Sequence, residues 1–299
     1  MKVLCYGSLN IDFTYEVDHF VQKGETISSQ ALRTCGGGKG LNQSTALAKA
    51  GAEVYHAGCV GEDGRFLLEQ MEASGIHTEY VTVLREVRTG NAIIQNDRDG
   101  DNCIILYGGA NHAITSAQAD AVLDAFEAGD FLLLQNEINH LEYIIRKAHE
   151  KKLKIILNPS PMDEKILGLP LEMVDYFVLN EIEACQILGC RAETQGEEMA
   201  KLLRERFPAA AIVLTLGGDG SVYADREQFF RQPVYRVKAV DTTAAGDTFT
   251  GYFIAALLKG LAAAQAMDIA ARAAAIAVTR KGASPSVPEW AEAESFLFP

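Results

Sequence analysis

Short apolar runs and longer stretches with helical spacing alternate along most of the chain. The runs that predict buried strands lie at 2–6, 54–60, 130–135, 154–157, 175–179 and 211–214. The stretches that predict helices lie at 42–50, 65–74, 117–127, 141–151, 199–206, 249–261 and 263–277. Buried strands that alternate with helices are typical of parallel strands joined by crossover connections. The pattern therefore predicts a three-layer α/β/α fold with a mainly parallel central sheet.

Other segments alternate apolar and polar residues, which is typical of strands with one face in solvent. They lie at 13–17, 26–33, 89–95 and 102–107, the last two joined by a turn at 97–101. We expect them to form a small β-sheet, from about 11–34 and 87–109, that projects from a single α/β domain covering 1–299. Such a sheet would act as a lid that keeps water from a reacting centre.

A predicted strand at 235–240 runs into small residues at the point where the apolar helix 249–261 begins. Ala244, Ala245 and Gly246 allow a ligand to approach the backbone, and free amides at a helix N-terminus bind anions. Asp247 lies in the first turn, where its charged form is stabilised. A carboxylate base beside an anion hole suits phosphoryl transfer to a hydroxyl. An ordinary helix cap accounts for the spacing about equally well.

Polar residues also follow several predicted strands, where ligands bind in open parallel sheets. Asn10 and Asp12 point to the same side of extended chain and suit sugar hydroxyls, although taken alone a solvated turn accounts for them better. Glu137 lies just past the strand 130–135, where it would accept hydrogen bonds from hydroxyls or else serve as an acid at the start of a helix. Asn180 and Glu183 offer oxygen ligands for Mg²⁺, or else form a capping box. A glycine-containing loop at 215–220 suits a nucleotide contact or a plain turn.

The glycine-rich segment at 36–43 fits neither a Walker loop nor a dinucleotide fingerprint, because Gly40 follows Lys39 and the glycine spacing fails at Leu41. Its glycines remove side-chain bulk, so a ligand can touch the backbone. Asn42 falls in the first turn of the next helix.

Composition narrows the function classes. The chain has 48% hydrophobic residues and a formal net charge of −13, from 27 basic and 40 acidic residues. This balance argues against nucleic acid or an anionic membrane as the main partner. Six scattered cysteines without a C-x-x-C pair, no long apolar segment and no signal-peptide pattern indicate a cytoplasmic protein.

The segment Asp-Thr-Thr-Ala-Ala-Gly-Asp-Thr-Phe at 241–249 resembles the C-terminal signature of the ribokinase family of carbohydrate kinases. Gly-Gly-Lys-Gly-Leu-Asn-Gln at 37–43 is similar to the family's N-terminal signature, and Gly-Ser-Leu-Asn-Ile-Asp at 7–12 to its start. Four further segments match segments of the family in the same order along the chain: Gln-Asn-Glu at 135–137, Asn-Glu-Ile-Glu at 180–183, Thr-Leu-Gly-Gly-Asp-Gly at 215–220 and the tail at 278–288. Gly36 departs from the pattern, where the family has a larger apolar residue, so we expect a looser loop.

The resemblance implies a kinase that transfers the γ-phosphoryl group of ATP to a primary hydroxyl of a pentose. The expected pentose is D-ribose, which gives ribose 5-phosphate. It implies that Asp247 is the base and that the amides of Ala244, Ala245 and Gly246 form the anion hole. The implied sugar-binding residues are Asn10, Asp12, Gly38, Lys39, Gly40, Asn42, Glu137 and Asp247. The implied ATP-binding residues are Asn180, Thr215, Gly217, Gly218, Asp219, Gly220 and Gly246.

The resemblance also implies two cations. Mg²⁺ would bind through Asn180 and Glu183, by way of water. K⁺ would bind at Asp241, Thr243, Ala277, Arg280, Gly282 and Ser286. The family's adenine contact falls near Ala271, a small residue that cannot stack on a base.

Three other functions remain open at this point: a kinase of another sugar or a nucleoside, a sugar sensor without catalysis, and a nucleotide-binding oxidoreductase. Asn10, Asp12 and Glu137 favour a small polyhydroxylated sugar over a nucleoside. The missing glycine fingerprint disfavours the oxidoreductase. Exposed lid strands often pair between subunits, which predicts a homodimer.

Overall fold

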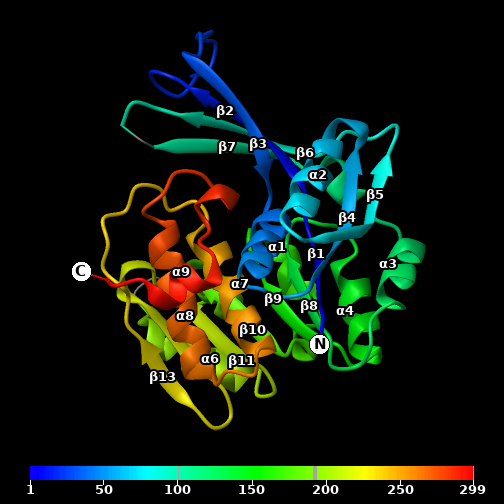
Figure 1. Ribbon diagram of the computed structural model, residues 1–299, viewed down its shortest axis with the longest axis vertical. Helices are drawn as coiled ribbons and strands as arrows, with labels where there is room; N and C mark the ends of the chain where they lie inside the picture. The colour runs from blue at the N-terminus through cyan, green and yellow to red at the C-terminus, as the bar shows by residue number, and fades with distance from the viewer. Residues whose placement is uncertain (100, 191–193, 299) are drawn as a thin grey trace.

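Two β-sheets organise the chain in the computed structural model, which describes residues 1–99, 101–190 and 194–298. Gly100, in the predicted turn at 97–101, and Pro299, at the end of the predicted domain, lie outside the described residues. The larger sheet has nine strands in the order β13-β12-β11-β10-β9-β8-β1-β4-β5. The smaller has four, in the order β3-β2-β6-β7, and projects above the rest of the molecule (Figure 1).

The six predicted apolar runs and one further strand, at 77–84, form the parallel part of the larger sheet. Its strands are β1 (Val3–Tyr6), β4 (Val54–Gly61), β5 (His77–Leu84), β8 (Phe131–Gln135), β9 (Lys154–Asn158), β10 (Tyr176–Asn180) and β11 (Ala211–Thr215). Strands β12 (Ser221–Ala224) and β13 (Phe229–Gln232) extend it with antiparallel pairing. All four residues of β1 are buried, since β4 and β8 flank it and helices cover both faces.

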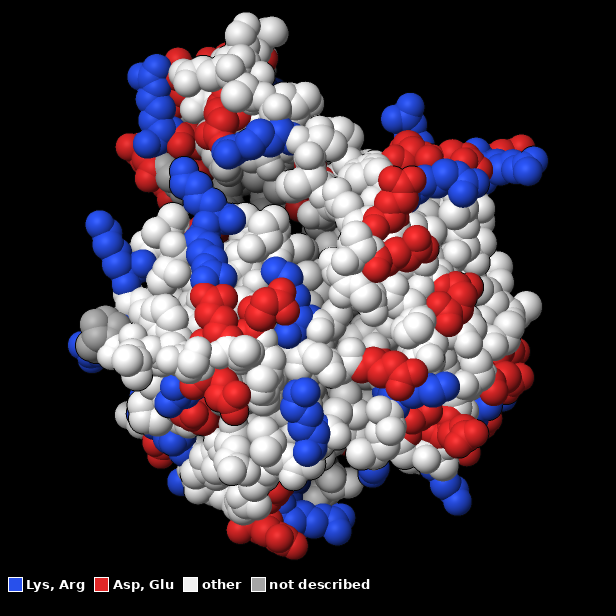
Figure 2. Space-filling view, in the orientation of Figure 1, with Lys and Arg blue, Asp and Glu red and all other residues white. Residues whose placement is uncertain are grey.

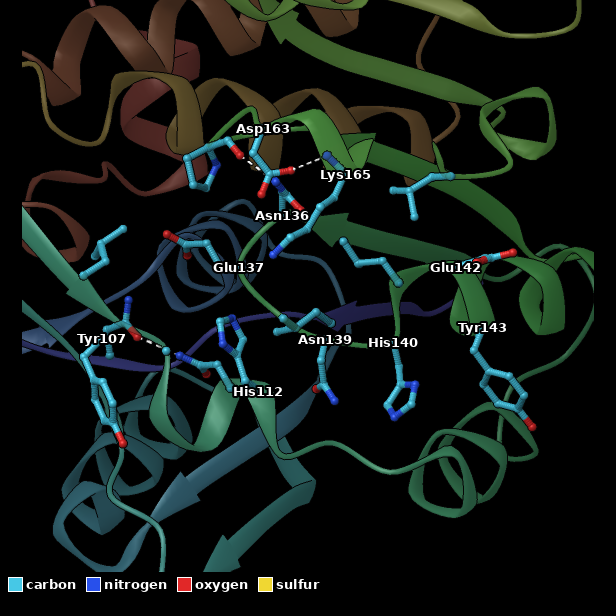
Figure 3. Close-up of a pocket in the computed structure, with 18 of the residues that line it drawn as sticks. Tyr107, His112, Asn136, Glu137, Asn139, His140, Glu142, Tyr143, Asp163 and Lys165 are labelled. Carbon is cyan, nitrogen blue, oxygen red and sulfur yellow. Dashed lines mark hydrogen bonds between the residues drawn. The ribbon is translucent and has the colours of Figure 1, made fainter. Parts of the chain in front are cut away.

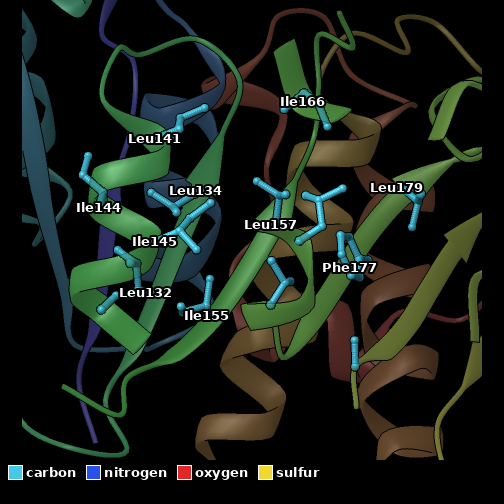
Figure 4. Packing of buried hydrophobic residues seen from close by; sticks show 14 of the residues in the cluster. Leu132, Leu134, Leu141, Ile144, Ile145, Ile155, Leu157, Ile166, Phe177 and Leu179 are labelled. Carbon is cyan, nitrogen blue, oxygen red and sulfur yellow. The ribbon is translucent and has the colours of Figure 1, made fainter. Parts of the chain in front are cut away.

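Two buried apolar clusters, one on each face of the larger sheet, make the fold three-layered. The first joins sheet residues to α3 (Ser116–Leu123), α4 (Leu141–Glu150), α5 (Glu181–Leu188) and α6 (Gly196–Arg206), and Figure 4 shows part of it. The second joins the other face to α1 (Lys39–Lys49), α2 (Arg65–Ala73), α7 (Ala245–Leu258) and α8 (Ala263–Ala277), with α9 (Trp290–Ser295) packed at the edge. The predicted α/β fold with a mainly parallel sheet is confirmed.

The smaller sheet consists of β2 (Asn10–Glu16), β3 (Ala31–Gly37), β6 (Gly90–Asn96) and β7 (Asn102–Tyr107). Strand β2 pairs parallel with β6, while its pairing with β3 and that of β6 with β7 are antiparallel. Strand β3 starts at Ala31, opposite Glu16 at the end of β2, so the predicted strand at 26–33 was wrong over its first half. The 3-10 turn Gly109–His112 returns the chain to the main body.

The strand predicted at 235–240 is also wrong. The Tyr235 ring stacks on Phe298 with centroids 4.2 Å apart, and the Val240 amide donates to the carbonyl of Val278 at 2.7 Å. These contacts direct the segment to the C-terminal tail and to the end of α8. The edge of the larger sheet is occupied by β13 instead.

Charges of both signs are interspersed over the face shown in Figure 2, with no large area of one sign. Among the described residues, no helix combines the length and apolar character that a membrane span requires.

Candidate active site

Asp247 lies in the first turn of α7 and is 6% exposed. Helix α7 begins with small residues and no side chain caps it, so its first turn stays accessible to a ligand. Asn42 donates from Nδ2 to Asp247 Oδ2 at 3.1 Å, and Gln43 donates from Nε2 to Asp247 Oδ1 at 2.9 Å. Both donors belong to α1, so the residues that follow the glycine-rich segment hold the carboxylate.

The backbone amides at the start of α7 are partly used within the turn. The Ala245 amide donates to the Thr242 carbonyl at 3.2 Å, and the Thr248 amide to the Ala244 carbonyl at 2.8 Å. In the part of the chain that the structure describes, the Gly246 amide has no hydrogen-bond partner. A Cβ added at Gly246 would meet nothing within 4 Å. The amide of Gly246 is therefore available to an anion.

The glycine-rich turn and Glu137 are joined directly. Glu137, beyond the end of β8, accepts hydrogen bonds through Oε2 from the Lys39 amide at 2.9 Å and from the Ser8 hydroxyl. Ser8 Oγ also accepts from the Gly40 amide at 3.2 Å. Gly38 precedes α1 with a φ of 92°, a conformation that glycine adopts without strain. The segment from Lys39 to Gln43 thus connects Glu137 to Asp247.

The carboxylate of Asp12 is partly buried and lies within range of the charge of Glu137. Burial, and secondarily the charge of Glu137, raise the pKa of Asp12 from 3.8 to about 7. Its carboxylate packs over Gly37, where an added Cβ would lie 2.0 Å from Oδ2. Asp12 is therefore close to half-charged at neutral pH, next to the residues predicted to bind sugar.

Lys39 supplies the positive charge among these carboxylates. Burial alone would lower the pKa of Lys39, but the negative charges of Asp247, Glu137 and Glu183 outweigh that effect and raise it. The ammonium therefore stays charged within range of all three carboxylates. A negatively charged group brought close to Lys39 would be attracted by this cation.

Asn111, which the sequence analysis did not single out, is buried against Asn10. It is 2% exposed, accepts from the Leu9 amide at 3.0 Å and donates to Asn10 Oδ1 at 2.7 Å. Asn111 therefore fixes the carboxamide of Asn10. Gln43 and Ser8 were also missed as site residues, although both lie inside the segments that carry the motifs.

A cavity of about 800 Å³ opens beside Asn10 and Glu137. Figure 3 shows Glu137, Asn136 and His112 on one side of the cavity, with His140 and Tyr143 toward the other side. Tyr107 of β7 contributes to the wall, so the smaller sheet forms part of the enclosure. Asp247 does not line this cavity.

Strands β10 and β11 bring the predicted nucleotide residues together. Asn180 and Thr215 are register partners at the carboxyl ends of these strands. The Glu183 amide donates to Asn180 Oδ1 at 2.9 Å, and the Asn180 amide to Glu183 Oε2 at 3.0 Å. This is the capping box that the sequence left open as an alternative. Gly217, Gly218, Asp219 and Gly220 form a tight turn after β11, and the Asp219 carbonyl accepts from Arg231.

The loop before α7 meets the C-terminal tail at Asp241. Its two carboxylate oxygens accept from the Thr243 amide at 3.0 Å and the Gly282 amide at 2.9 Å. Burial would raise the pKa of Asp241, but these hydrogen bonds and that from the Thr243 hydroxyl lower it. The side chains of Arg280 and Ser286 are engaged elsewhere, with Glu292 and with the Ala283 carbonyl, while the Ala277 carbonyl accepts from the Arg280 amide.

Gly36 lies within β3, where an added Cβ would be 2.8 Å from Gln70 Oε1 and 2.9 Å from Leu67 Cδ2. The expectation of a looser loop at Gly36 was wrong. A larger residue would collide with the side chains of α2. Glycine at this position therefore allows α2 to pack directly against β3.

The comparisons with known proteins agree over almost the whole chain. The model of the pfkB family carbohydrate kinases matches residues 1–290. A ribokinase of Staphylococcus aureus is 35% identical over 301 residues, covering 96% of each chain. A solved structure of Arabidopsis thaliana ribokinase with ribose and ATP superposes with a TM-score of 0.86 at 29% identity, covering 98% of this chain and 97% of that one. A ribokinase of Cryptococcus neoformans in complex with ADP gives a TM-score of 0.84 at 32% identity, covering 98% of both chains. The chain belongs to the pfkB family of carbohydrate kinases.

Proposed function

We propose that this carbohydrate kinase transfers the γ-phosphoryl group of ATP to the primary hydroxyl of D-ribose, giving ribose 5-phosphate. The observation that carries the proposal is the buried carboxylate of Asp247 at the open N-terminus of α7. It is hydrogen-bonded to the same segment, Lys39 to Gln43, that binds Glu137. One continuous site thus offers a base, an anion-binding turn and acceptors for several hydroxyls.

In the proposed acceptor site, the sugar is held between the smaller sheet and α1. Asp12, Glu137 and Asn10 accept or donate hydrogen bonds to its hydroxyls, and Asn42, Gly38 and Gly40 contact it from the turn before α1. Asp247 accepts the proton of the hydroxyl that attacks phosphorus. The strands around Asp12 act as the lid that excludes water, which would otherwise compete as acceptor.

In the proposed donor site, ATP lies across the ends of β10 and β11. The turn Gly217–Asp219, with Gly220, and the side chains of Asn180 and Thr215 contact the nucleotide. The amides at the start of α7, Gly246 foremost, receive the transferring phosphoryl group. Lys39 adds a positive charge that offsets charge on the phosphoryl oxygens.

The residues present fit a Mg²⁺ ion that is held mainly by water and phosphate. Asn180 and Glu183 offer only oxygen ligands, and the described residues contain no group of three or more His, Cys, Asp or Glu that could hold a metal. Mg²⁺ commonly keeps several waters in such sites. When bound with ATP, the ion would neutralise charge on the phosphate oxygens.

The loop at Asp241 fits a monovalent cation such as K⁺. Asp241 is kept charged where two segments meet, because the amides of Thr243 and Gly282 and the Thr243 hydroxyl donate to its carboxylate. We propose that Asp241, Thr243, Ala277, Arg280, Gly282 and Ser286 form this site, with Arg280 and Ser286 contributing main-chain oxygens. A cation there would stabilise the loop that leads into the anion hole.

The smaller sheet carries an exposed apolar surface that we propose as a homodimer contact. The exposed apolar residues of this sheet are Leu32, Ile93, Ile105 and Tyr107, which the strand register places on one face, and Ile104 and Leu106 on the other. Ile105 is the most exposed at 63%. Sedimentation velocity tests it: Ile105→Asp should shift the protein to monomer. Leu297→Asp, at an exposed position near the C-terminus, should not. A monomeric wild type, or a dimer that survives Ile105→Asp, would refute the contact.

The experiment that tests the proposed function is ADP release, measured with a coupled assay, over a panel of pentoses, hexoses and nucleosides. We expect the highest kcat/KM with D-ribose and mass-spectrometric identification of ribose 5-phosphate. Nucleosides belong in the panel because the cavity beside Glu137 leaves room beyond a pentose. Sugar binding without ADP release would support a sensor instead, and a nucleoside preferred over every sugar would replace ribose as the acceptor.

A further inference from the structure

We propose that Gln43 is a positioning residue for the base, acting on Asp247 without touching either substrate. The inference rests on the proposed role of Asp247 in phosphoryl transfer. Gln43 lies on α1 and is 0% exposed, and its Nε2 donates to Asp247 Oδ1 at 2.9 Å. The other carboxylate oxygen, Oδ2, receives a hydrogen bond from Asn42.

The orientation of the Gln43 amide is determined by its other neighbours. Its Oε1 accepts from Gln135 Nε2 at 2.7 Å, and its Nε2 also donates to Asn158 Oδ1 at 2.9 Å. Asn158 is in turn fixed because its Nδ2 donates to the Val178 carbonyl at 2.9 Å. Turning the Gln43 amide over would place its oxygen against two acceptors and its NH₂ group against a donor. Its NH₂ group must therefore face Asp247.

The four buried amide and carboxylate groups link two strands and two helices at one point. Gln135 ends β8, Asn158 ends β9, Gln43 belongs to α1 and Asp247 to α7. Gln135, Gln43, Asn158 and Asp247 are all buried. Because these elements belong to the core of the fold, the network holds the carboxylate in one rotamer relative to the sheet.

The two donors to Asp247 differ in what else they face. Asn42 accepts through Oδ1 from the Ser284 hydroxyl at 3.0 Å and belongs to the predicted sugar-binding residues. Gln43 is fully buried, and its other partners, Gln135 and Asn158, are buried as well. We infer that Gln43 fixes Asp247 Oδ1 and stabilises its charged form, which leaves Oδ2 for the attacking hydroxyl when the sugar engages Asn42.

The test compares Gln43→Met, Gln135→Met and the wild type. Gln43→Met keeps most of the side-chain volume but removes the donor. We expect kcat to fall roughly 10- to 100-fold, the range for loss of a hydrogen bond to a charged group, with little change in the KM of the sugar. The acid limb of the pH profile should move to higher pH, because a carboxylate that loses a donor is protonated more easily.

Gln135→Met keeps Gln43 but removes the group that orients it, so it should shift kcat and the acid limb in the same direction by a smaller factor. Gln118→Met is the matched control, because Gln118 on α3 makes comparable hydrogen bonds, to Gly58 and Thr82, away from the base. It should lower thermal stability at most and leave the pH profile unchanged.

Wild-type kcat and an unmoved acid limb in Gln43→Met would overturn the inference, even if its melting temperature falls. If Gln43→Met does not fold, an unmoved acid limb in Gln135→Met would overturn it equally. A wild type that phosphorylates none of the acceptors would instead refute the proposed function, so the two failures are distinguishable.

Discussion

The raised pKa of Asp12 predicts that sugar affinity depends on pH near neutrality. The pKa of about 7 arises from burial and from the charge of Glu137. A carboxylate accepts hydrogen bonds from two hydroxyls better than a neutral carboxyl group does, so we expect the sugar to select the ionised form of Asp12. Sugar binding should therefore release a proton at pH 6 to 7.

The size of the effect follows from the fraction of Asp12 that is ionised. Apparent affinity falls in proportion to the competent fraction, so with a pKa of about 7 the apparent Kd should rise about tenfold between pH 8 and pH 6. Isothermal titration calorimetry with ribose checks this, and two buffers of different ionisation enthalpy measure the released proton. The variant Asp12→Asn should bind the sugar weakly and without this pH dependence.

The same group predicts a change in stability with a defined sign. Because the folded state raises the pKa of Asp12 above its usual 3.8, the folded chain binds the proton more tightly than the unfolded chain. Stability is therefore lost as pH rises from about 4 to about 7. A shift of about 3 units corresponds to about 4 kcal/mol, and partial exposure of Asp12 reduces the expected effect to about 1–3 kcal/mol.

Asp12→Asn should thus raise the free energy of unfolding at pH 8 and change it little at pH 4, as measured by urea denaturation. The reasoning would be refuted by wild-type sugar affinity that is flat from pH 6 to 8. It would also be refuted by an Asp12→Asn variant that is no more stable at pH 8 than the wild type.

Two further substitutions test how the proposed acceptor site is built. Gly37→Ala places a methyl group 2.0 Å from Asp12 Oδ2, so steady-state assays should show a raised KM for the sugar. Gly168→Ala is the control and should leave the KM unchanged, because a Cβ added there meets nothing within 4 Å. Equal KM values in the two variants would contradict the packing argument. Asn111→Leu leaves the Leu9 amide unpaired and Asn10 unfixed, so urea denaturation should show a loss of about 1–3 kcal/mol together with a raised KM for the sugar. Unchanged KM with lowered stability would limit Asn111 to a structural role.

The parts of the fold that local pattern determines were predictable. Alternating apolar runs and helices predicted the parallel sheet, because a strand buried on both faces requires a continuous apolar run. The helix at 263–277 has the predicted ends, and the capping box at Asn180 and Glu183 follows from residues three apart. The resemblance to the carbohydrate kinases is confirmed by the family match over residues 1–290.

The errors come from contacts between distant segments. Residues 235–240 alternate like a strand, but Tyr235 contacts the C-terminal tail and Val240 the end of α8, and neither pairs along the sheet edge. At Gly36 the sequence carries no sign of the nearby α2 side chains that exclude a larger residue.

The site residues that sequence reasoning missed share the same cause. Gln43 reaches Asp247 across 204 positions, and Asn111 reaches Asn10 across 101 positions. An amide side chain in a helix or a turn has no local pattern that distinguishes a buried network from an exposed surface. Their position inside or next to glycine-rich segments was the one available signal.

The most direct test of the central claim is the turnover of Asp247→Asn with saturating ribose and ATP. If Asp247 takes the proton of the acceptor hydroxyl, kcat should fall roughly 10²- to 10⁴-fold while the variant still folds and binds the sugar. A folded Asp247→Asn variant that turns over at close to the wild-type rate would contradict the account.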